Sequence, residues 1–492
     1  MERSAGILLP ISSLPSNYGI GTLGKQAYKF VDFLVKAKQT YWQILPIGQT
    51  SYGDSPYQTF SIYAGNPYFV DLDLLKEDGL LDKKDLKGLK PVNCEYIEYE
   101  KLFNTRYIVL FKAYKKGIKK YKNIFNDWLK DNIGIQDYAF YYSIKEYFGY
   151  KSWIDWPDND IRKRKEEAVI KYKELLKERI EFYEFIQFLF FKQFNELKKY
   201  MNEKGIKLIG DIPIYVPLDS CDCWMNPECF ELDEDYVPKA VAGVPPDYFS
   251  EDGQLWGNPL YNYEYMKSNG YKWWIDRIGA SSNIYDVIRI DHFRGFESYW
   301  SVPYGDKTAK NGKWIKGPGM DLLGPLKGWF NNVEFIAEDL GYHTPGVEQL
   351  LHDFGFPGMK VLEFGFDSRE PSNHAPHTYT NNFICYVGTH DNSTIIGWLS
   401  AADKKDVAYS LEYLGLKNYE DFNWAMIRAG MSSVANLFVA QIQDYLGLDD
   451  SARINTPGTL GNNWKWRLKK NELNSKLANK IARYTKMYER CR

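Results

Sequence analysis

Acidic side chains stand near the ends of several short apolar runs of this sequence, where they could do acid–base and nucleophilic chemistry. Asp291 lies in the run DVIRIDHF, Glu338 in VEFIAEDL and Asp391 in FICYVGTHD. A lone buried carboxylate is costly, and one such acid by itself is more often a cap or half of an ion pair. Several acids on different strands at one rim instead indicate a site, because glycosidic-bond chemistry needs an acid and a nucleophile on facing strands.

Three further polar residues accompany these acids. Arg289 lies two residues before Asp291 and therefore shares its face of the strand. A guanidinium there is expected to keep Asp291 ionised, as a nucleophile requires. His390 directly precedes Asp391, and Asp211 lies inside the apolar run IKLIGDIPIYV. The pattern predicts a polar cluster at one end of a set of strands.

The elements that must position these side chains alternate between buried strands and helices. Short apolar runs typical of parallel strands recur along the chain, and amphipathic stretches such as 25–38 separate many of them. The eight predicted strands lie in 6–10, 41–48, 206–216, 286–293, 333–340, 360–366, 383–391 and 434–447. Eight strands in βα alternation predict an α/β fold, a (β/α)8 TIM barrel, rather than an open sheet.

A single catalytic domain is expected over 1–492, with two insertions above the C-terminal rim of the barrel and no separate C-terminal β domain. Residues 49–205 are largely helical in sequence and include an extended amphipathic stretch from about 162 to 203. Residues 217–262 are rich in Pro, Gly and acids, and predict a structured loop over the active site. The lysine-rich stretch 111–125 is interpreted as a solvated helix face rather than an anion site.

Two motifs that could bind a cofactor or metal are better explained structurally. Residues Gly19 to Gly24 (GIGTLG) fit the dinucleotide pattern, but eight residues separate them from the preceding strand and no acid follows to hold a ribose. Cys221, Cys223 and Cys229 cluster without the partners that complete a zinc site. The motifs H-E-x-x-H and G-x-S-x-G are absent. We therefore expect no metal and no cofactor.

The composition excludes several classes of partner and compartment. Lys and Arg number 62 against 64 Asp and Glu, and this balance argues against a nucleic-acid or anionic-membrane partner. The sequence has no run of about 18 apolar residues, so no membrane span is predicted. The start MERSAGILLP is too short an apolar stretch for a signal peptide, and six cysteines in 492 residues do not make a disulfide scaffold. A cytoplasmic location is expected.

Several long segments, taken together and in order, resemble the 4-α-glucanotransferases (amylomaltase or disproportionating enzyme) of glycoside hydrolase family 77. The resemblance covers nearly the whole chain. The matching segments are GILLPISSLPSNYGIGTLG (6–24), SYGDSPYQTFSIYAGNPYFVDL (51–72), GDIPIYV (210–216), AGVPPDYFSEDGQLWGNPLY (242–261), IRIDHFRGFESYW (288–300), AEDLG (337–341), GTHDN (388–392) and RINTPGTLGNNWKWRL (453–468). SCDCW (220–224) departs from the family, which commonly has smaller or apolar residues there.

The resemblance implies a retaining double displacement that cleaves a maltooligosaccharide or other α-1,4-glucan and passes the glycosyl unit to another sugar's 4-hydroxyl. In that reaction Asp291 resembles the nucleophile and Glu338 the acid/base. Asp391 would hold sugar hydroxyls at the cleavage subsite, and its charge would help to keep Glu338 protonated.

The same resemblance implies a set of substrate-binding positions. These are Tyr57, Asp211, Arg289 and His390 at the subsites, and Tyr248, Phe249 and Gln254 in a loop over the acceptor side. That loop favours transfer over hydrolysis, although an α-glucan hydrolase with the same acids stays an alternative. The three acids disfavour a non-catalytic glucan-binding protein, and the failed dinucleotide pattern disfavours a dehydrogenase. Oligomeric state and preferred chain length are left open.

Overall fold

Eight parallel strands form a nearly closed barrel at the centre of the computed structural model, which describes residues 1–91, 95–246, 250–341 and 344–491. The order around the sheet is β10-β11-β12-β1-β2-β3-β6-β9. The strands are β1 (Ser4–Leu8), β2 (Tyr41–Gln43), β3 (Lys207–Pro213), β6 (Val287–Asp291), β9 (Glu334–Ala337), β10 (Gly358–Val361), β11 (Phe383–Tyr386) and β12 (Leu437–Gln441). The amide of Ala337 donates to Pro357 O at 3.1 Å across the remaining gap between β9 and β10. Each predicted run overlaps one strand, and the predicted TIM barrel is confirmed.

Strict alternation along the strands separates the barrel interior from its outer surface. Every strand contributes to one buried interior cluster, whose members include Leu8, Tyr41, Ile209, Val287, Ile336, Met359, Ile384 and Leu437. On β12 the intervening Phe438 and Ala440 belong instead to the large cluster under the helices. The interior is therefore packed with side chains, and polar residues of the same parity can lie only above it, at the strand ends.

Most strands are shorter than their apolar runs predict, as β10 and β12 illustrate. β10 ends at Val361, and a 3-10 turn, Leu362–Gly365, follows it. β12 ends at Gln441, and helix α17 (Ile442–Leu446) begins at the next residue. The apolar residues beyond the strands pack under the rim rather than into the sheet, and periodicity alone does not distinguish these two kinds of burial.

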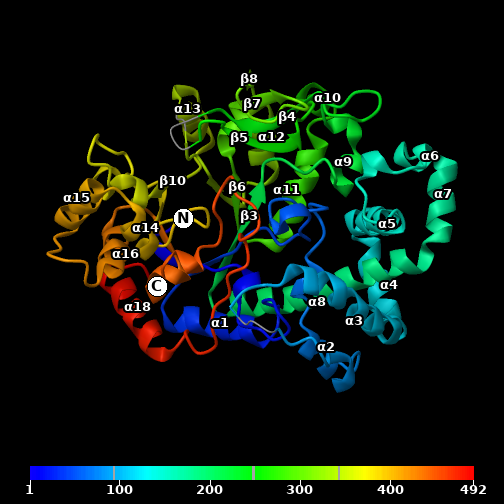
Figure 1. The fold of residues 1–492 in the computed structure, drawn as a ribbon, viewed down its shortest axis with the longest axis horizontal. Helices are drawn as coiled ribbons and strands as arrows, with labels where there is room; N and C mark the ends of the chain where they lie inside the picture. The colour runs from blue at the N-terminus through cyan, green and yellow to red at the C-terminus, as the bar shows by residue number, and fades with distance from the viewer. Residues whose placement is uncertain (92–94, 247–249, 342–343, 492) are drawn as a thin grey trace.

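Helices cover the outside of the barrel and extend to one side of it (Figure 1). Those around the barrel include α1 (Lys25–Lys36), α11 (Lys272–Ile284), α12 (Met320–Trp329), α13 (Pro345–Phe354), α14 (Ile395–Ala401), α15 (Lys404–Leu414), α16 (Phe422–Ser432) and α18 (Ser475–Met487). Between β2 and β3 the chain forms α2 (Leu72–Glu77), α3 (Tyr99–Lys120), α4 (Lys122–Lys130), α5 (Ile133–Tyr147), α6 (Asn159–Arg162), α7 (Glu166–Leu175) and α8 (Lys177–Glu203). Helices α3 to α7 lie on the right of Figure 1, and α8 runs back from them toward the barrel.

The lysine-rich stretch lies on α3 and α4 and has the predicted solvated face. Lys112, Lys116 and Lys120 pair with Asp85, Asp82 and Asp78, and these lysine side chains stay 44–50% exposed. Exposed pairs of this kind hold their positive charge in water beside their acidic partners. The stretch therefore supplies no anion site.

A four-stranded antiparallel sheet stands beside the barrel rim, at the top of Figure 1. Its order is β5-β4-β7-β8, with β4 at Ala240–Val244, β5 at Gln254–Pro259, β7 at Ser298–Pro303 and β8 at Lys313–Lys316. Strands β4 and β5 lie inside the predicted loop 217–262, near the helices α9 (Cys221–Met225) and α10 (Tyr263–Ser268). β7 and β8 follow β6 in the chain, where the sequence predicts no strand, so part of this unit lies outside the predicted insertion.

The glycine-rich motif is the expected structural turn. Gly24 caps the N-terminus of α1, and a Cβ atom added to it would meet Asp71 Oδ2 at 2.1 Å. Thr22 Oγ1 donates to the same carboxylate oxygen at 2.6 Å. An acidic side chain therefore occupies the position where a dinucleotide phosphate would have to bind.

The described cysteines are free thiols, and Cys221, Cys223 and Cys229 are buried. Burial raises the pKa of each of these three thiols. Across the part of the chain that the structure describes, no group of three or more His, Cys, Asp or Glu side chains could hold a metal ion. None of the helices described there is both long and apolar enough to cross a membrane.

Candidate active site

Polar residues continue the inward-facing positions of the strands just above the apolar interior. On β6, Val287 belongs to the interior cluster, and Arg289 and Asp291 follow at intervals of two residues. On β9, Ile336 belongs to the same cluster, and Glu338 follows two residues later. The two-residue period of a strand thus directs the predicted acids into the mouth of the barrel.

Arg289 binds two carboxylates at once. It lies opposite Asp211 in the β3–β6 register, and its Nη1 lies 2.7 Å from both carboxylate oxygens of Asp211 and 3.0 Å from Asp291 Oδ1. The side chains of Arg289 and Asp211 are 4% and 0% exposed, whereas that of Asp291 is 28% exposed. The guanidinium is thus anchored on a buried acid and holds one oxygen of an acid that faces the cleft.

Tyr57 and His390 extend this network from two other parts of the chain. The Tyr57 hydroxyl donates to Asp211 Oδ2 at 2.8 Å and lies 2.9 Å from His390 Nε2. The two rings are stacked, with centroids 5.3 Å apart. Trp464 packs beside both of them, at 5.8 Å from Tyr57 and 6.0 Å from His390.

Asp391 is held ionised at the edge of the same network. Asn455 Nδ2 donates to its Oδ1 at 2.6 Å, and His390 Nε2 lies 3.4 Å from its Oδ2. Burial raises the pKa of Asp391, but the His390 charge and the hydrogen bonds from His390 and Asn455 outweigh it and lower the pKa to about 2. Arg453 Nη2 donates to the backbone oxygen of Asp391 at 2.6 Å and fixes the loop.

The carboxylate of Glu338 is oriented by the residue that follows Asp291. His292 adopts a left-handed conformation with φ 54°, and its amide donates to Glu338 Oε2 at 2.7 Å. The amide of Leu340 donates to Oε1 at 2.8 Å. A left-handed residue that is not glycine is uncommon. Here this conformation lets the amide that follows β6 bind Glu338, the acid that follows β9.

The two facing acids differ in how firmly they hold a proton. Burial, and then the charge of Asp291, raise the pKa of Glu338 to about 7. Burial also raises the pKa of Asp291, to about 6, although Arg289 opposes the rise as expected. Because the Arg289 guanidinium contacts Asp291 directly, we expect the negative charge of this coupled pair to rest on Asp291 and the proton on Glu338.

The predicted help from the charge of Asp391 in keeping Glu338 protonated stays a prediction. After burial, the charge that raises the pKa of Glu338 most is that of Asp291. The charge of Asp391 raises the pKa of Asp291.

The predicted acceptor loop is described only in part. Tyr248 and Phe249 lie outside the described residues. Gln254 begins β5, and its Oε1 accepts a hydrogen bond from Trp256 Nε1 at 3.2 Å. The Trp256 ring lies edge-on to His292 with centroids 4.7 Å apart, so Gln254 joins the site through Trp256.

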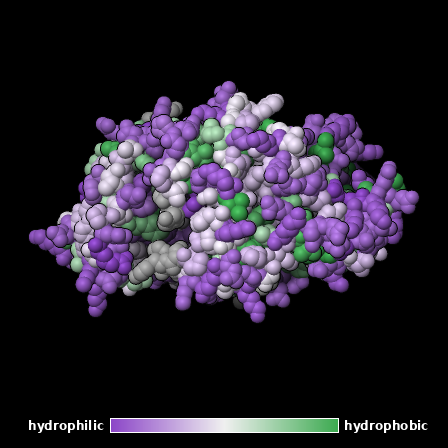
Figure 2. Space-filling view, turned by 90° about the horizontal axis from the view of Figure 1, so that it is seen from above, coloured by the Kyte–Doolittle hydropathy of each residue, from purple (hydrophilic) through white to green (hydrophobic). Residues whose placement is uncertain are grey.

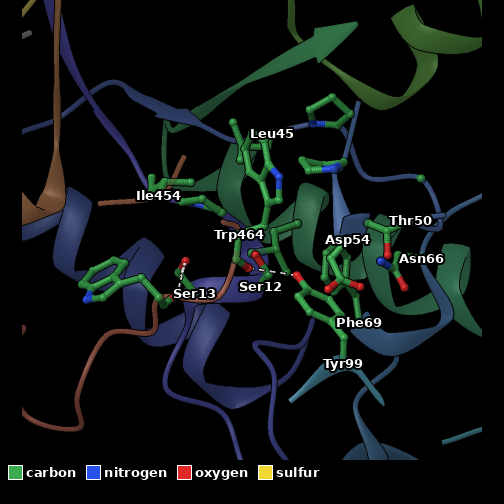
Figure 3. Close-up of a pocket in the computed structure, with 16 residues that line it drawn as sticks. Ser12, Ser13, Leu45, Thr50, Asp54, Asn66, Phe69, Tyr99, Ile454 and Trp464 are labelled. Carbon is green, nitrogen blue, oxygen red and sulfur yellow. Dashed lines mark hydrogen bonds between the residues drawn. The ribbon is translucent and has the colours of Figure 1, made fainter. Parts of the chain in front are cut away.

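Sequence reasoning missed Arg453, Asn455 and Trp464 as members of this site. All three belong to the segment RINTPGTLGNNWKWRL, which is part of the family resemblance but has no strand pattern to mark them. Trp464 also lines a small pocket, shown in Figure 3. There the Tyr99 hydroxyl donates to the backbone oxygen of Trp464 at 3.0 Å, and Asp54 and Asn66 line the wall.

Comparison with known proteins finds one family along nearly the whole chain. The family model of the 4-alpha-glucanotransferases, glycoside hydrolase family 77, matches residues 9–473. The chain is 50% identical to a 4-alpha-glucanotransferase of Clostridium butyricum, over 98% of this chain and 99% of that one. It is 46% identical to one of Streptococcus pneumoniae, over 99% and 98%. The solved amylomaltase of Streptococcus agalactiae in complex with acarbose is 43% identical, with a TM-score of 0.98 over 100% of both chains.

Proposed function

The chain belongs to glycoside hydrolase family 77, the 4-alpha-glucanotransferases, and is a hexosyltransferase; from this premise we propose that it works by a retaining double displacement on Asp291. The observation that carries the proposal is the bond from the His292 amide to Glu338 Oε2. It holds Glu338, whose pKa is raised, next to the residue that directly follows Asp291, an acid bound by the Arg289 guanidinium. A retaining enzyme needs this pair.

In the first step Asp291 attacks the anomeric carbon of the donor. Arg289 holds Asp291 Oδ1, which directs the other oxygen, Oδ2, to the reaction. Glu338 gives its proton to the glycosidic oxygen as the bond breaks, and the departing sugar leaves as an alcohol. The products are a glycosyl ester on Asp291 and an ionised Glu338.

In the second step Glu338 takes the proton from the 4-hydroxyl of an acceptor sugar, whose oxygen displaces Asp291. The new α-1,4 bond forms, and both acids return to their first state. Asp391, held ionised by His390 and Asn455, and the Arg289–Asp211–Tyr57 network are suited to bind the hydroxyls of the sugar at the cleaved bond. Charges fixed in advance stabilise the transition state without reorganisation.

The proposed substrates are maltooligosaccharides and longer α-1,4-glucans. Support comes from the solved relative, which binds acarbose. We also propose a cytoplasmic location, which is supported by the five free cysteines of the described chain, since thiols persist in reducing compartments.

The deciding experiment is incubation with maltotriose alone, followed by both the product ladder and the total of reducing ends. Transfer yields glucose and longer oligomers at a constant total of reducing ends. Hydrolysis raises that total, and a binding protein changes neither. A rising total without longer oligomers would replace the proposed transfer with hydrolysis.

We expect kcat/KM to follow a bell-shaped pH profile. As pH falls through about 6, Asp291 gains a proton and stops being a nucleophile. As pH rises through about 7, Glu338 loses the proton that the leaving oxygen needs. Initial rates at low maltotriose concentration and constant ionic strength measure the two limbs, which belong to the coupled pair. A rate that is flat from weakly acidic to weakly alkaline pH would contradict the assignment.

We also expect the first product to keep the α configuration. A retaining mechanism places the carboxyl groups of Asp291 and Glu338 about 5–5.5 Å apart, whereas an inverting one needs about 6.5–9.5 Å to admit a water. Proton NMR of the oligomers longer than maltotriose distinguishes an α from a β linkage at the newly formed bond, which does not mutarotate. A first product in the β configuration would rule out the ester on Asp291.

A further inference from the structure

A row of side chains crosses the antiparallel sheet from one edge to the other. Leu255 on β5 lies opposite Gly243 on β4, Gly243 opposite Trp300 on β7, and Trp300 opposite Trp314 on β8. Residues in direct register project from the same face of a sheet. The row therefore places a leucine and two indoles on one face, with the glycine between the leucine and the first indole.

Solvent reaches both ends of this row. Leu255 is 37% exposed and Trp314 is 39% exposed, while Trp300 is partly buried. A Cβ atom on Gly243 would meet Gln254 O at 2.5 Å. The position therefore requires glycine, and no side chain stands between Leu255 and Trp300. The Trp300 and Trp314 rings lie 5.2 Å apart at 68°, which presents a ring face next to a ring edge.

The aromatic side chains of the row are fixed in place. The guanidinium of the buried Arg294 lies 4.0 Å from the centroid of the Trp314 ring, and Trp300 Nε1 donates to Ala309 O at 2.8 Å. A ring that is already immobilised loses little side-chain entropy when a ligand stacks on it. Because Arg294 covers one face of Trp314, the exposed surface belongs to the rest of that ring.

The row and the candidate active site are linked at both ends of the sheet. Arg294, which packs on Trp314, follows Asp291 by three residues. Gln254 and Trp256 flank Leu255 on β5 and project from the opposite face, where Trp256 contacts His292. A glucan that reaches both the row and the site must therefore pass over β5, which is an edge strand of this sheet.

We propose that Leu255, Trp300 and Trp314 bind a remote segment of an α-1,4-glucan whose reacting end lies at Asp291. This inference rests on the proposed function. The C–H faces of glucose units stack on indole rings, and Asp252, Lys310 and Asn311 supply polar groups around the row. Figure 2 looks onto the side of the molecule that carries this sheet, where small hydrophobic areas are scattered among hydrophilic ones. Such a surface suits a sugar chain better than a protein partner, which needs a contiguous patch.

The test compares a long and a short acceptor in the Trp314→Ala variant. The ratio of kcat/KM for amylose to kcat/KM for maltotriose should fall about three- to tenfold, as expected for the loss of one aromatic stacking contact. Trp314→Phe should recover part of the ratio. Trp329→Ala is the matched control, because Trp329 lies at the end of α12 and is 70% exposed; it should leave the ratio unchanged.

Direct binding separates recognition from effects on the fold. Amylose should bind Trp314→Ala more weakly than the unaltered chain by a similar factor in affinity electrophoresis, with unchanged thermal unfolding. An unaltered ratio together with unaltered amylose binding, or an equal loss on both substrates, overturns the proposal. A chain that makes no longer oligomers from maltotriose would instead refute the proposed function, whatever the Trp314 variants do.

Discussion

Replacing Asp291 by Asn or Glu338 by Gln should each lower kcat/KM for maltotriose disproportionation by at least about 10²–10⁴-fold. Asp291→Asn removes the oxygen that forms the ester. Glu338→Gln removes the proton that the leaving oxygen requires, because an amide cannot supply it. Both substitutions nearly conserve shape, and Asn and Gln can still accept the hydrogen bonds that Arg289 and His292 donate to the acids. The fold should therefore be kept.

An activated donor distinguishes the two roles. With α-glucosyl fluoride the leaving group departs without a proton, so Glu338→Gln should regain the first step, seen as release of fluoride, while Asp291→Asn should not. Glu334→Gln is the matched control, because Glu334 begins β9, the strand that Glu338 directly follows, and lies at its end away from the cleft. Equal rescue of both variants would reverse or remove the assignment of nucleophile and acid/base.

The barrel could be predicted because its strands repeat one physical requirement. Each strand is buried on both faces, and this produces a short continuous apolar run that the sequence displays directly. β7 and β8 lack that mark. In β8, KWIK, only one residue is even partly buried and the others are exposed, and the strand exists because it pairs with β7. Pairing between segments is a tertiary property, so the antiparallel sheet could not be predicted from either segment alone.

The acids of the site could be predicted because the strand period places them. Val287, Arg289 and Asp291 share one face of β6. Val287, at the start of the strand, lies in the apolar interior cluster, and so Arg289 and Asp291 lie toward the mouth of the barrel. Asn455 and Trp464 could not be found in this way, since they reach Asp391 and Tyr57 from loops far along the chain. The sequence also did not predict that the charge of Asp291 raises the pKa of Glu338. This effect depends on the distance between two strands, which the spacing of residues within one strand does not contain.

The register of β3 against β6 leads to the second large effect, which concerns Arg289. This residue compensates a fully buried acid, Asp211, and also contacts Asp291. In Arg289→Met the methionine fills much of the space but donates no hydrogen bond to Asp211. Among the side chains that the structure describes, the Tyr57 hydroxyl is then the one donor that remains to the Asp211 carboxylate. Removing one partner of a buried pair costs about 3–5 kcal/mol. We expect a loss of this size in the free energy of unfolding at neutral pH, measured by urea denaturation.

The double variant Asp211→Asn/Arg289→Met shows whether charge is the cause. A neutral amide at position 211 needs no counter-ion and can still accept the Tyr57 hydroxyl, so the double variant should recover most of the stability that the single variant loses. It should not recover activity, because Arg289 no longer holds Asp291 Oδ1. In the single variant any residual rate should fall off at a higher pH on the acidic limb, because Arg289 lowers the pKa of Asp291; in the double variant this shift should be smaller, because the charge of Asp211 raises that pKa. Arg369→Met is the matched control, since Arg369 pairs with Asp367 at 2.7 Å but is 62% exposed, and exposed pairs contribute about 0–1 kcal/mol. If Arg289→Met and Arg369→Met cost the same, the buried network does not stabilise the fold through its charges, and Arg289 is present for catalysis alone.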